Sequence, residues 1–149
     1  MNIRPATSAD LAAILELERS TPSAAHWSQA QYDAILNAPH ATERLVLIAE
    51  VEAGPSGFLV ARSASDEWEI ENVVVAEFAR RRGLGRKLVE SLRDAARPRG
   101  ARALFLEVRE SNLAALALYE SCGFKKTGRR IGYYSCPTED AILYSFAFS

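Results

Sequence analysis

The chain has 149 residues, 48% of them hydrophobic and 25% charged, as in an ordinary globular protein with a buried core, so we expect a single domain over residues 1–149. The formal net charge of −1 gives no general attraction to nucleic acid or to an anionic membrane, and any basic surface must be local. The N-terminal stretch MNIRPATSAD lacks the apolar segment of a secretory signal, and no later run reaches the roughly 18 apolar residues of a membrane span. We therefore expect a cytoplasmic protein with no nucleic-acid or membrane partner.

Short strands and helices alternate along the first half of the chain. The spacing of Thr7 and Asp10 predicts a capping box for a first helix, and Ser28 predicts the cap of a second helix that ends near Pro39. Hydrophobic runs bounded by turn residues predict strands at Asn2 to Arg4, Arg44 to Val51, Gly57 to Ala61 and Trp68 to Val75. Short turns join the last three runs, so we expect them to form an antiparallel meander.

The same alternation continues through the second half. The patterns predict helices over about Leu84 to Arg97 and Asn112 to Ser121, and strands at Ala103 to Val108, near Phe124 to Gly128 and at Ala141 to Phe146. This order indicates an α/β fold with a mixed sheet.

The cysteines indicate neither a disulfide framework nor a metal site. Cys122 and Cys136 lack metal-ligand spacing, and the histidines, His26 and His40, are far from both in sequence. We read both cysteines as free thiols and expect no metal.

A block of arginines and two glycines connects the strand ending at Val75 to the helix beginning near Leu84. A helix N-terminus offers unpaired N–H groups and a positive dipole end, glycines let a phosphate approach them, and arginines add charge-assisted hydrogen bonds. The segment RRRGLGR, residues 80–86, therefore has the composition of an anion-binding loop. A tight turn with solvated arginines remains the alternative, because the motif matches neither a Rossmann fingerprint nor a P-loop.

Glu107 stands in a strand whose neighbours Leu104, Phe105, Leu106 and Val108 are all apolar, so we expect both faces of the strand to be buried and the carboxylate to have a purpose there. The structural alternative is an ion pair with Arg109 or Arg102.

Tyr119 follows on the next predicted helix, where an ordinary packed aromatic residue is the alternative reading. If the chain turns back at Ser111, Glu107 lies ~13 Å from the turn along the strand and Tyr119 ~12 Å along the helix, so the two share a level. A carboxylate base and a phenolic acid beside a phosphate-binding loop suit transfer of a group from a nucleotide-bearing thioester to an amine.

Three segments together resemble the GNAT acetyltransferases, and within them the RimI-type enzymes, which acetylate the N-terminal alanine of a small-subunit ribosomal protein. The resemblance covers nearly the whole chain, and its most specific parts are Arg80-x-x-Gly83-x-Gly85, Leu106 to Phe124, and Arg130 to Tyr134 with Glu139 to Ala141. It implies the GNAT fold, in which a mixed, mostly antiparallel central sheet carries helices on both faces.

The resemblance also implies roles for individual residues. Glu107 matches the general base and Tyr119 the general acid. Acetyl-CoA is expected to contact Val73, Val74, Val75, Arg80, Arg81, Arg82, Gly83, Leu84, Gly85, Arg86 and Asn112. The acceptor is expected to contact Trp27, Tyr133, Tyr134 and Glu139. His26 stands where a proline is usual, and the segment between Tyr134 and Glu139 is short; both departures bear on the acceptor rather than on the chemistry.

Three functions remain in competition. The first is acetylation of a protein N-terminal α-amine, such as that of a ribosomal protein, by direct attack in a ternary complex; the second is acetylation of a small amine such as an antibiotic or polyamine. The third is a non-catalytic acyl-CoA-binding or nucleic-acid-binding module that uses the patch from Arg80 to Lys87. The presence of both Glu107 and Tyr119 argues against the third, and the pair Tyr133-Tyr134, which can wall a peptide groove, favours the first over the second.

Overall fold

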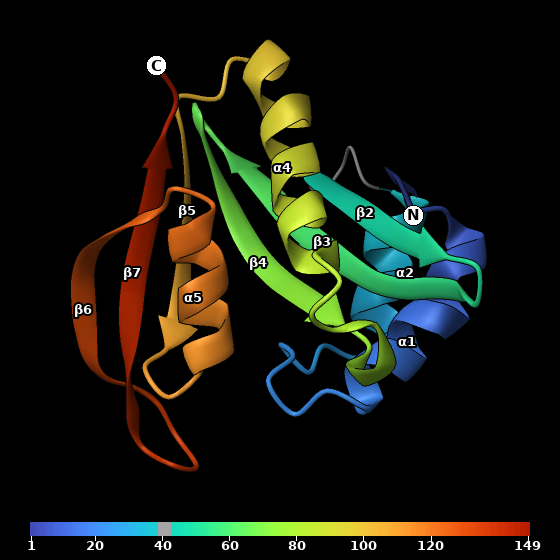
Figure 1. The fold of residues 1–149 in the computed structure, drawn as a ribbon, viewed down its shortest axis with the longest axis horizontal. Helices are drawn as coiled ribbons and strands as arrows, with labels where there is room; N and C mark the ends of the chain where they lie inside the picture. The colour runs from blue at the N-terminus through green and yellow to red at the C-terminus, as the bar shows by residue number, and fades with distance from the viewer. Residues whose placement is uncertain (39–42) are drawn as a thin grey trace.

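The structure, a computed structural model, describes residues 1–38 and 43–149. Its centre is a seven-stranded sheet in the order β1-β2-β3-β4-β5-β7-β6 (Figure 1). The strands are β1 (Asn2–Pro5), β2 (Arg44–Val51), β3 (Gly54–Ala64), β4 (Glu67–Val75), β5 (Ala103–Arg109), β6 (Lys125–Tyr134) and β7 (Glu139–Ala147). Among these strands only β4 and β5 pair in parallel, which confirms the mixed, mostly antiparallel sheet.

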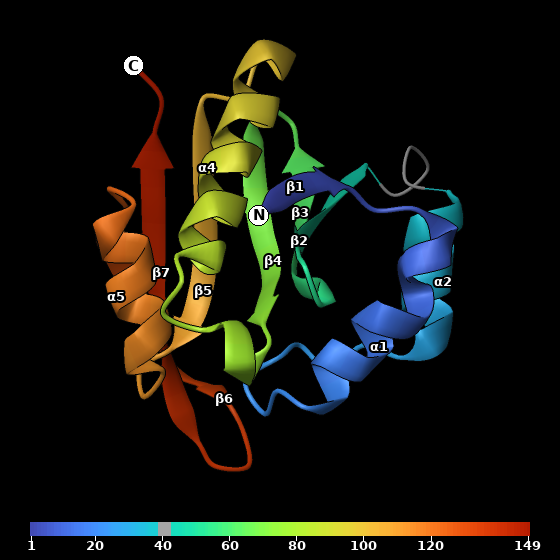
Figure 2. The ribbon, with the colours of Figure 1, turned by 45° about the vertical axis from the view of Figure 1, so that its right-hand side comes forward.

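Helices cover both faces of the sheet. Helices α1 (Leu11–Arg19) and α2 (Gln29–Asn37) lie on one face, and α4 (Leu84–Ala96) and α5 (Leu113–Ser121) lie on the other (Figures 1 and 2). Helix α4 is amphipathic, and its buried stripe consists of Leu84, Leu88, Val89, Leu92 and Ala96. Burial of this stripe against the sheet contributes to the apolar core.

The predicted caps and the meander are confirmed. Thr7 with Asp10 and Ser28 with Gln31 form complete capping boxes, and β2, β3 and β4 pair as consecutive antiparallel strands. The predicted helix end at Pro39 lies outside the described residues. Strand boundaries were wrong at β3, which begins at Gly54, inside the expected turn, and ends at Ala64, and at β6, which continues past Gly128 to Tyr134.

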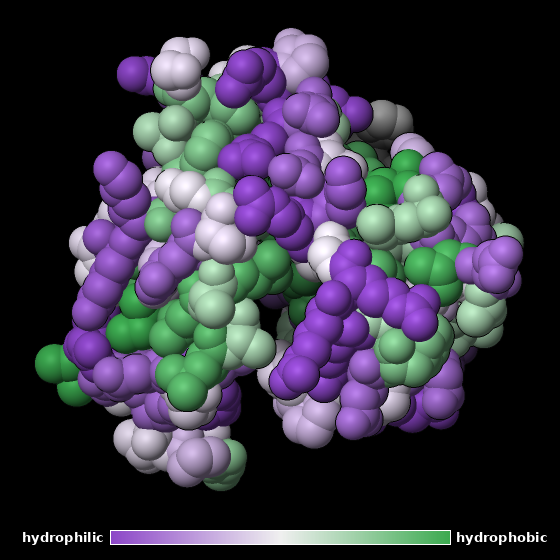
Figure 3. Space-filling view, in the orientation of Figure 1, coloured by the Kyte–Doolittle hydropathy of each residue, from purple (hydrophilic) through white to green (hydrophobic). Residues whose placement is uncertain are grey.

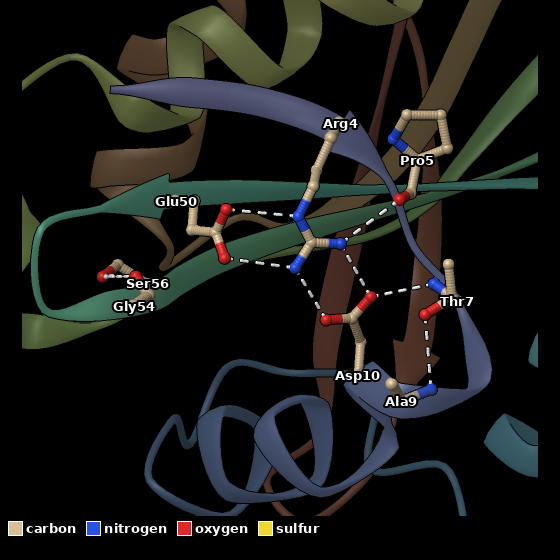
Figure 4. A network of polar contacts seen from close by, with 8 residues as sticks. All are labelled: Arg4, Pro5, Thr7, Ala9, Asp10, Glu50, Gly54 and Ser56. Atoms are coloured by element: carbon tan, nitrogen blue, oxygen red, sulfur yellow. Dashed lines mark hydrogen bonds and ion pairs between the residues drawn. The ribbon is translucent and has the colours of Figure 1, made fainter.

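Arg4 fastens the N-terminal segment to the edge of the sheet (Figure 4). Its Nη1 and Nη2 donate to the two oxygens of Asp10 at 2.9 and 2.8 Å, and its Nε and Nη2 donate to Glu50 of β2 at 3.2 Å each. Asp10 also accepts the N–H of Thr7 at 2.8 Å. The carboxylate, whose pKa is lowered by the hydrogen bonds from Arg4, thereby joins β1, β2 and the turn that starts α1.

Strands β4 and β5 separate after a short parallel contact. They pair only from Glu67–Glu69 to Ala103–Phe105 among the described residues, and β4 carries a bulge opposite Val60 and Ala61 of β3, which bends a strand. Beyond this contact, β4 stays paired with β3 and β5 stays paired with β7. The surface is hollowed between the two halves of the sheet (Figure 3), and we call this feature the β4–β5 opening.

Candidate active site

The end of β4 forms one side of the β4–β5 opening. Residues Val73 to Val75 pair with β3, but in the described part of the chain no strand pairs with their other edge. The carbonyl of Val75 accepts a hydrogen bond from Arg80 Nε at 3.1 Å. This edge therefore presents backbone N–H and C=O groups to an extended ligand, as the resemblance implies for Val73, Val74 and Val75.

The arginine loop surrounds the start of α4. Gly83, with φ +80°, is the N-cap of this 13-residue helix and has no side chain to satisfy the first N–H groups. The first helical hydrogen bond is donated by the N–H of Lys87 to the carbonyl of Gly83 at 3.0 Å. Around this end lie the exposed side chains of Arg80, Arg81, Arg82 and Arg86. Cations around an uncapped helix N-terminus suit an anionic ligand such as a diphosphate.

Gly85 lies where α4 packs closely against α5. A Cβ at this position would lie 3.2 Å from Leu118 Cδ2 of α5, which is tighter than a normal van der Waals contact. The phosphate contact expected at Gly85 stays a prediction, and the structure adds that the missing side chain lets α4 approach α5.

Glu107 is half-buried, on the more open face of β5. Leu104, Leu106 and Val108 are buried, and Phe105 and Glu107 alternate with them on the other face. The expectation that both faces are buried was therefore wrong, because Phe105 is apolar without being in the core. The Glu107 side chain is 17% exposed, and Glu107 follows the part of β5 that pairs with β4, so it lies at the β4–β5 opening.

The cation paired with Glu107 is Arg130 of β6, whose Nε lies 3.1 Å from Oε1. The partners expected from sequence are engaged elsewhere: Arg109 pairs with Glu139 at 3.1 Å and Arg102 with Asp66 at 3.4 Å. Sequence reasoning missed Arg130, since the order of the strands brings it to Glu107.

Two tyrosines at the end of β6 face Glu107. Tyr133 is 52% exposed, and its ring lies edge-on to the ring of Tyr134 with centroids 5.0 Å apart. The negative charge of Glu107 is the main cause that raises the pKa of Tyr133. Burial, and then Glu107, raise the pKa of Tyr134. The tyrosines therefore form an aromatic wall beside the carboxylate.

Glu69 of β4 is a further acidic residue near this wall. Burial raises its pKa, with additional contributions from the charges of Glu71 and Glu107. It pairs with Arg62 at 3.2 Å. The sequence reasoning missed it, although the alternation in EWEIENVVV places Glu67, Glu69 and Glu71 together on the less buried face of β4.

Tyr119 is buried on α5, with its ring centroid 5.6 Å from that of Phe124. Burial raises the pKa of Tyr119, and Cys122 and Tyr134 add to the effect. Tyr134 is therefore electrostatically coupled to both Glu107 and Tyr119. Among the described residues no hydrogen bond joins Glu107 directly to Tyr119, and we infer that any cooperation between them passes through bound reactants.

The remaining expected acceptor residues divide into two groups. Trp27 packs near the first helices. Its backbone N–H donates to Glu18 at 2.9 Å, its ring centroid lies 5.5 Å from that of Tyr32, and the guanidinium of Arg44 lies over its ring at 5.8 Å. The loop between α1 and α2 and the turn between β6 and β7 lie at the same end of the molecule (Figures 1 and 2). Trp27 and the tyrosine wall thus belong to different sides of the β4–β5 opening.

Glu139 and Asn112 each have a structural role. Glu139 accepts from Arg109 at 3.1 Å and from the N–H of Ser111 at 2.7 Å, which lower its pKa and hold the turn after β5. Asn112 caps α5 by accepting the N–H of Ala115 at 3.2 Å. These contacts leave the expected roles toward acceptor and acetyl-CoA as proposals.

Both cysteines are free, as predicted, with Cys122 buried and Cys136 exposed. Burial raises the pKa of Cys122, which makes its thiol a poor nucleophile. In residues 1–38 and 43–149 no group of three or more acidic, histidine or cysteine side chains is arranged for a metal ion, and no helix there is long and apolar enough to cross a bilayer.

Comparison with known proteins gives the same family as the motifs. The model of the acetyltransferase (GNAT) family matches residues 11–124. Over 98 residues the chain is 44% identical to the ribosomal protein bS18-alanine N-acetyltransferase of Salmonella typhimurium, a match that covers 63% of this chain and 65% of that relative. The match thus spans slightly less than two thirds of the relative's length.

Solved structures show the same fold. The crystal structure of the ribosomal-protein-S18-alanine N-acetyltransferase from Escherichia coli is similar with a TM-score of 0.84 at 32% identity, over 99% of this chain and 94% of that one. The structure of yncA from Salmonella typhimurium with its cofactor acetyl-CoA is similar with a TM-score of 0.85 at 25% identity, over 100% of this chain and 94% of that one. The chain therefore belongs to the GNAT family of acetyltransferases.

Proposed function

We propose that the protein transfers an acetyl group from acetyl-CoA to the N-terminal α-amine of a protein, with the N-terminal alanine of a ribosomal protein as the acceptor class. The observation that carries this proposal is the position of Glu107, a half-buried carboxylate at the β4–β5 opening with the wall of Tyr133 and Tyr134 beside it. The name of the Salmonella relative, a ribosomal protein bS18-alanine N-acetyltransferase, supports the acceptor class. Such an acceptor would be met in the cytoplasm.

The chain has groups that fit acetyl-CoA. The uncapped start of α4 and the side chains of Arg82 and Arg86 suit the diphosphate, and the free edge of Val73 to Val75 suits the extended arm. When bound there, acetyl-CoA supplies an activated acetyl thioester. The N–H groups at this edge of β4 would also polarise the acetyl carbonyl.

Glu107 would take a proton from the acceptor's ammonium group, directly or through one water. A free α-amine has a pKa of about 7.7 to 8.0, against about 10.4 for a lysine, so an N-terminus needs only a modest base. The neutral nitrogen forms the new N–C bond as the C–S bond breaks. The nitrogen loses two protons overall. One leaves through Glu107, and the other restores the proton that Tyr119 has given to the CoA thiolate.

The tyrosine wall would select the acceptor by size. A flexible N-terminus can enter as an extended strand, with its backbone groups bonded to the groove and its first side chain beneath the rings. We therefore expect small first residues, such as alanine followed by a polar residue, to be preferred.

Turnover with a panel of acceptors tests this proposal. The panel contains peptides beginning Ala-Arg, peptides with a large first residue, internal-lysine peptides, polyamines and aminoglycosides. We expect the Ala-Arg peptides to have the highest kcat/KM. Preferred turnover of a small amine over every free N-terminus would contradict the acceptor class and leave the acetyltransferase chemistry in place.

A further inference from the structure

The proposed base is already paired with a cation of the same chain. Arg130 Nε lies 3.1 Å from Glu107 Oε1, and the two side chains are 56% and 17% exposed. The guanidinium also lies over the ring of Tyr133 at 5.4 Å. The carboxylate that is proposed to receive the acceptor's ammonium group is thus already in contact with a cation.

Arg130 reaches Glu107 across an intervening strand. In the sheet, β7 separates β5 from β6, and the residue of β7 paired with Arg130 is Ala141. Paired residues share one face of a sheet, and the methyl group of Ala141 leaves the path open for a long side chain. The pair is therefore built over the sheet surface rather than within the core.

The β6 backbone departs from the ladder directly after Arg130. Pairing holds at Arg130 with Ala141 and resumes at Tyr134 with Glu139, so residues 131–133 lie opposite Asp140 alone. Gly132 has φ +62°, and its N–H donates to Asp140 at 2.9 Å. Arg130 thus lies at a register break of the edge strand β6, and its partly exposed side chain can move into solvent while the sheet stays intact.

Within residues 1–38 and 43–149, the cation in an ion pair with Glu107 is Arg130. From β4 it faces Glu69, and from β6 it faces Tyr133, Tyr134 and Arg130. Arg109 of β5 is held over the ring of Tyr134 at 4.4 Å. An arriving ammonium group therefore meets two carboxylates and two tyrosine rings, and it meets Arg130 at the carboxylate of Glu107.

We propose that Arg130 occupies the place at Glu107 that the acceptor's α-ammonium takes on binding, so that acceptor binding is an exchange of one cation for another. This inference rests on the proposed function, since it takes Glu107 as the acceptor site. The exchange admits a cationic amine and disfavours a neutral terminus, which has no charge to replace the guanidinium. It also keeps Glu107 paired until an acceptor is present.

Binding of two matched peptides tests the exchange. One peptide begins Ala-Arg with a free α-amine, and the other carries propionyl in place of the alanine and so lacks the amine. Affinities are measured near pH 6.5, where most α-amines are protonated, with CoA present and acetyl-CoA absent so that no acetyl transfer occurs. Arg130→Gln removes the charge, and Arg130→Lys keeps it.

The matched control is Arg129→Gln, because Arg129 precedes Arg130 on the same strand but pairs with Glu110 and Asp140 at 2.8 Å each. We expect Arg130→Gln to bind the amino peptide roughly two- to fivefold more tightly than wild type does, the worth of a partly exposed ion pair, with the des-amino peptide unchanged. Arg130→Lys should restore the wild-type ratio of the two affinities, and Arg129→Gln should not alter it.

Two results would overturn the exchange. Weaker binding of both peptides to Arg130→Gln would make Arg130 a peptide-binding group, and unchanged binding of both would make the ion pair irrelevant to the acceptor. A turnover assay of the wild-type protein separates these results from failure of the proposed function. Acetylation of the amino peptide combined with either result refutes the exchange alone, whereas no acetylation of any free N-terminus refutes the proposed function and the exchange with it.

Discussion

The carboxylate of Glu107 lies at the β4–β5 opening because of the alternation of side chains along β5. Its neighbours Leu106 and Val108 fill the core, and Glu107 points to the opposite, more open face. A functional role for Glu107 could be proposed from its residue type and its position in an apolar strand. Its partner Arg130 could not, since the contact depends on β7 lying between β5 and β6.

Replacing Glu107 by glutamine should remove the base while keeping the shape of the side chain. We expect kcat to fall by about 100-fold or more, the usual worth of a positioned base, with the Kd of acetyl-CoA nearly unchanged. Glu110→Gln is the control, because Glu110 lies just past β5 and pairs with the exposed Arg129. If Glu107→Gln kept wild-type kcat from about pH 6 to about pH 9, Glu107 would be a structural residue.

Tyr119→Phe should slow departure of the thiolate and leave packing against Phe124 in place. Because burial raises the pKa of Tyr119 above the usual value of about 10, its proton is held below that pKa and lost only above it. We therefore expect no loss of wild-type kcat through deprotonation of Tyr119 at any pH up to about 9. Tyr119→Phe should lower kcat by about 100-fold at every pH in that range. A normal kcat with an unchanged Tm would assign Tyr119 to the core.

At the scale of elements, the loop between α1 and α2 is held by a buried polar network. Glu18 accepts the N–H of Trp27 at 2.9 Å and the hydroxyl of Tyr32 at 2.7 Å. Asn72 of β4 donates to the same hydroxyl at 2.9 Å and accepts the N–H of Ala25 at 3.3 Å. One side of the β4–β5 opening thereby depends on side chains from α1, α2 and β4.

Tyr32→Phe tests what this network does. The change leaves the buried Glu18 without one donor, so we expect a loss of about 1 to 3 kcal/mol in the free energy of unfolding. The KM for the peptide should rise more than the Kd of acetyl-CoA, since Trp27 is one of the residues proposed to contact the acceptor. Urea unfolding and steady-state kinetics provide the two readings.

Tyr144→Phe is the matched control, because Tyr144 donates to Glu120 at 2.7 Å in the other half of the molecule. Its peptide KM should stay at the wild-type value. An equal rise of KM in both variants would mean that general loosening, rather than the loop, affects the acceptor.

Local patterns predicted elements well and their long-range pairing less well. The capping boxes at Thr7 and Ser28 depend on residues three positions apart, so the sequence carries them directly. The extension of β6 to Tyr134 depends on pairing that resumes with Glu139 after a register break, and no short window contains that contact. The role of Gly85 likewise appears only when Leu118 of α5 packs against it.

At the scale of the whole molecule, the β4–β5 opening divides the sheet, and a ligand bound there would join its halves. We expect acetyl-CoA at a hundred times its Kd to stabilise the fold by about 2.7 kcal/mol, which raises Tm by roughly 5 to 10 °C for a chain of this size. The double variant Arg82→Gln with Arg86→Gln should lose most of this shift, because both side chains surround the start of α4.

The control for that shift lies at the opposite end of α4. Arg97 and Arg99 follow the last turn of the helix, and replacing both by glutamine changes the net charge equally. The Tm shift with acetyl-CoA should then match wild type. Equal losses in the two double variants would mean that overall charge, rather than the loop, binds the ligand.

Mass spectrometry of protein N-termini from cells with and without the protein tests the central proposal most directly. We expect loss of the protein to remove α-acetylation from one or a few N-termini that begin with a small residue, a ribosomal protein among them, and we expect the wild-type gene to restore it where the Glu107→Gln gene does not. Unchanged N-terminal acetylation, or full restoration by Glu107→Gln, would contradict N-terminal acetylation with Glu107 as its base.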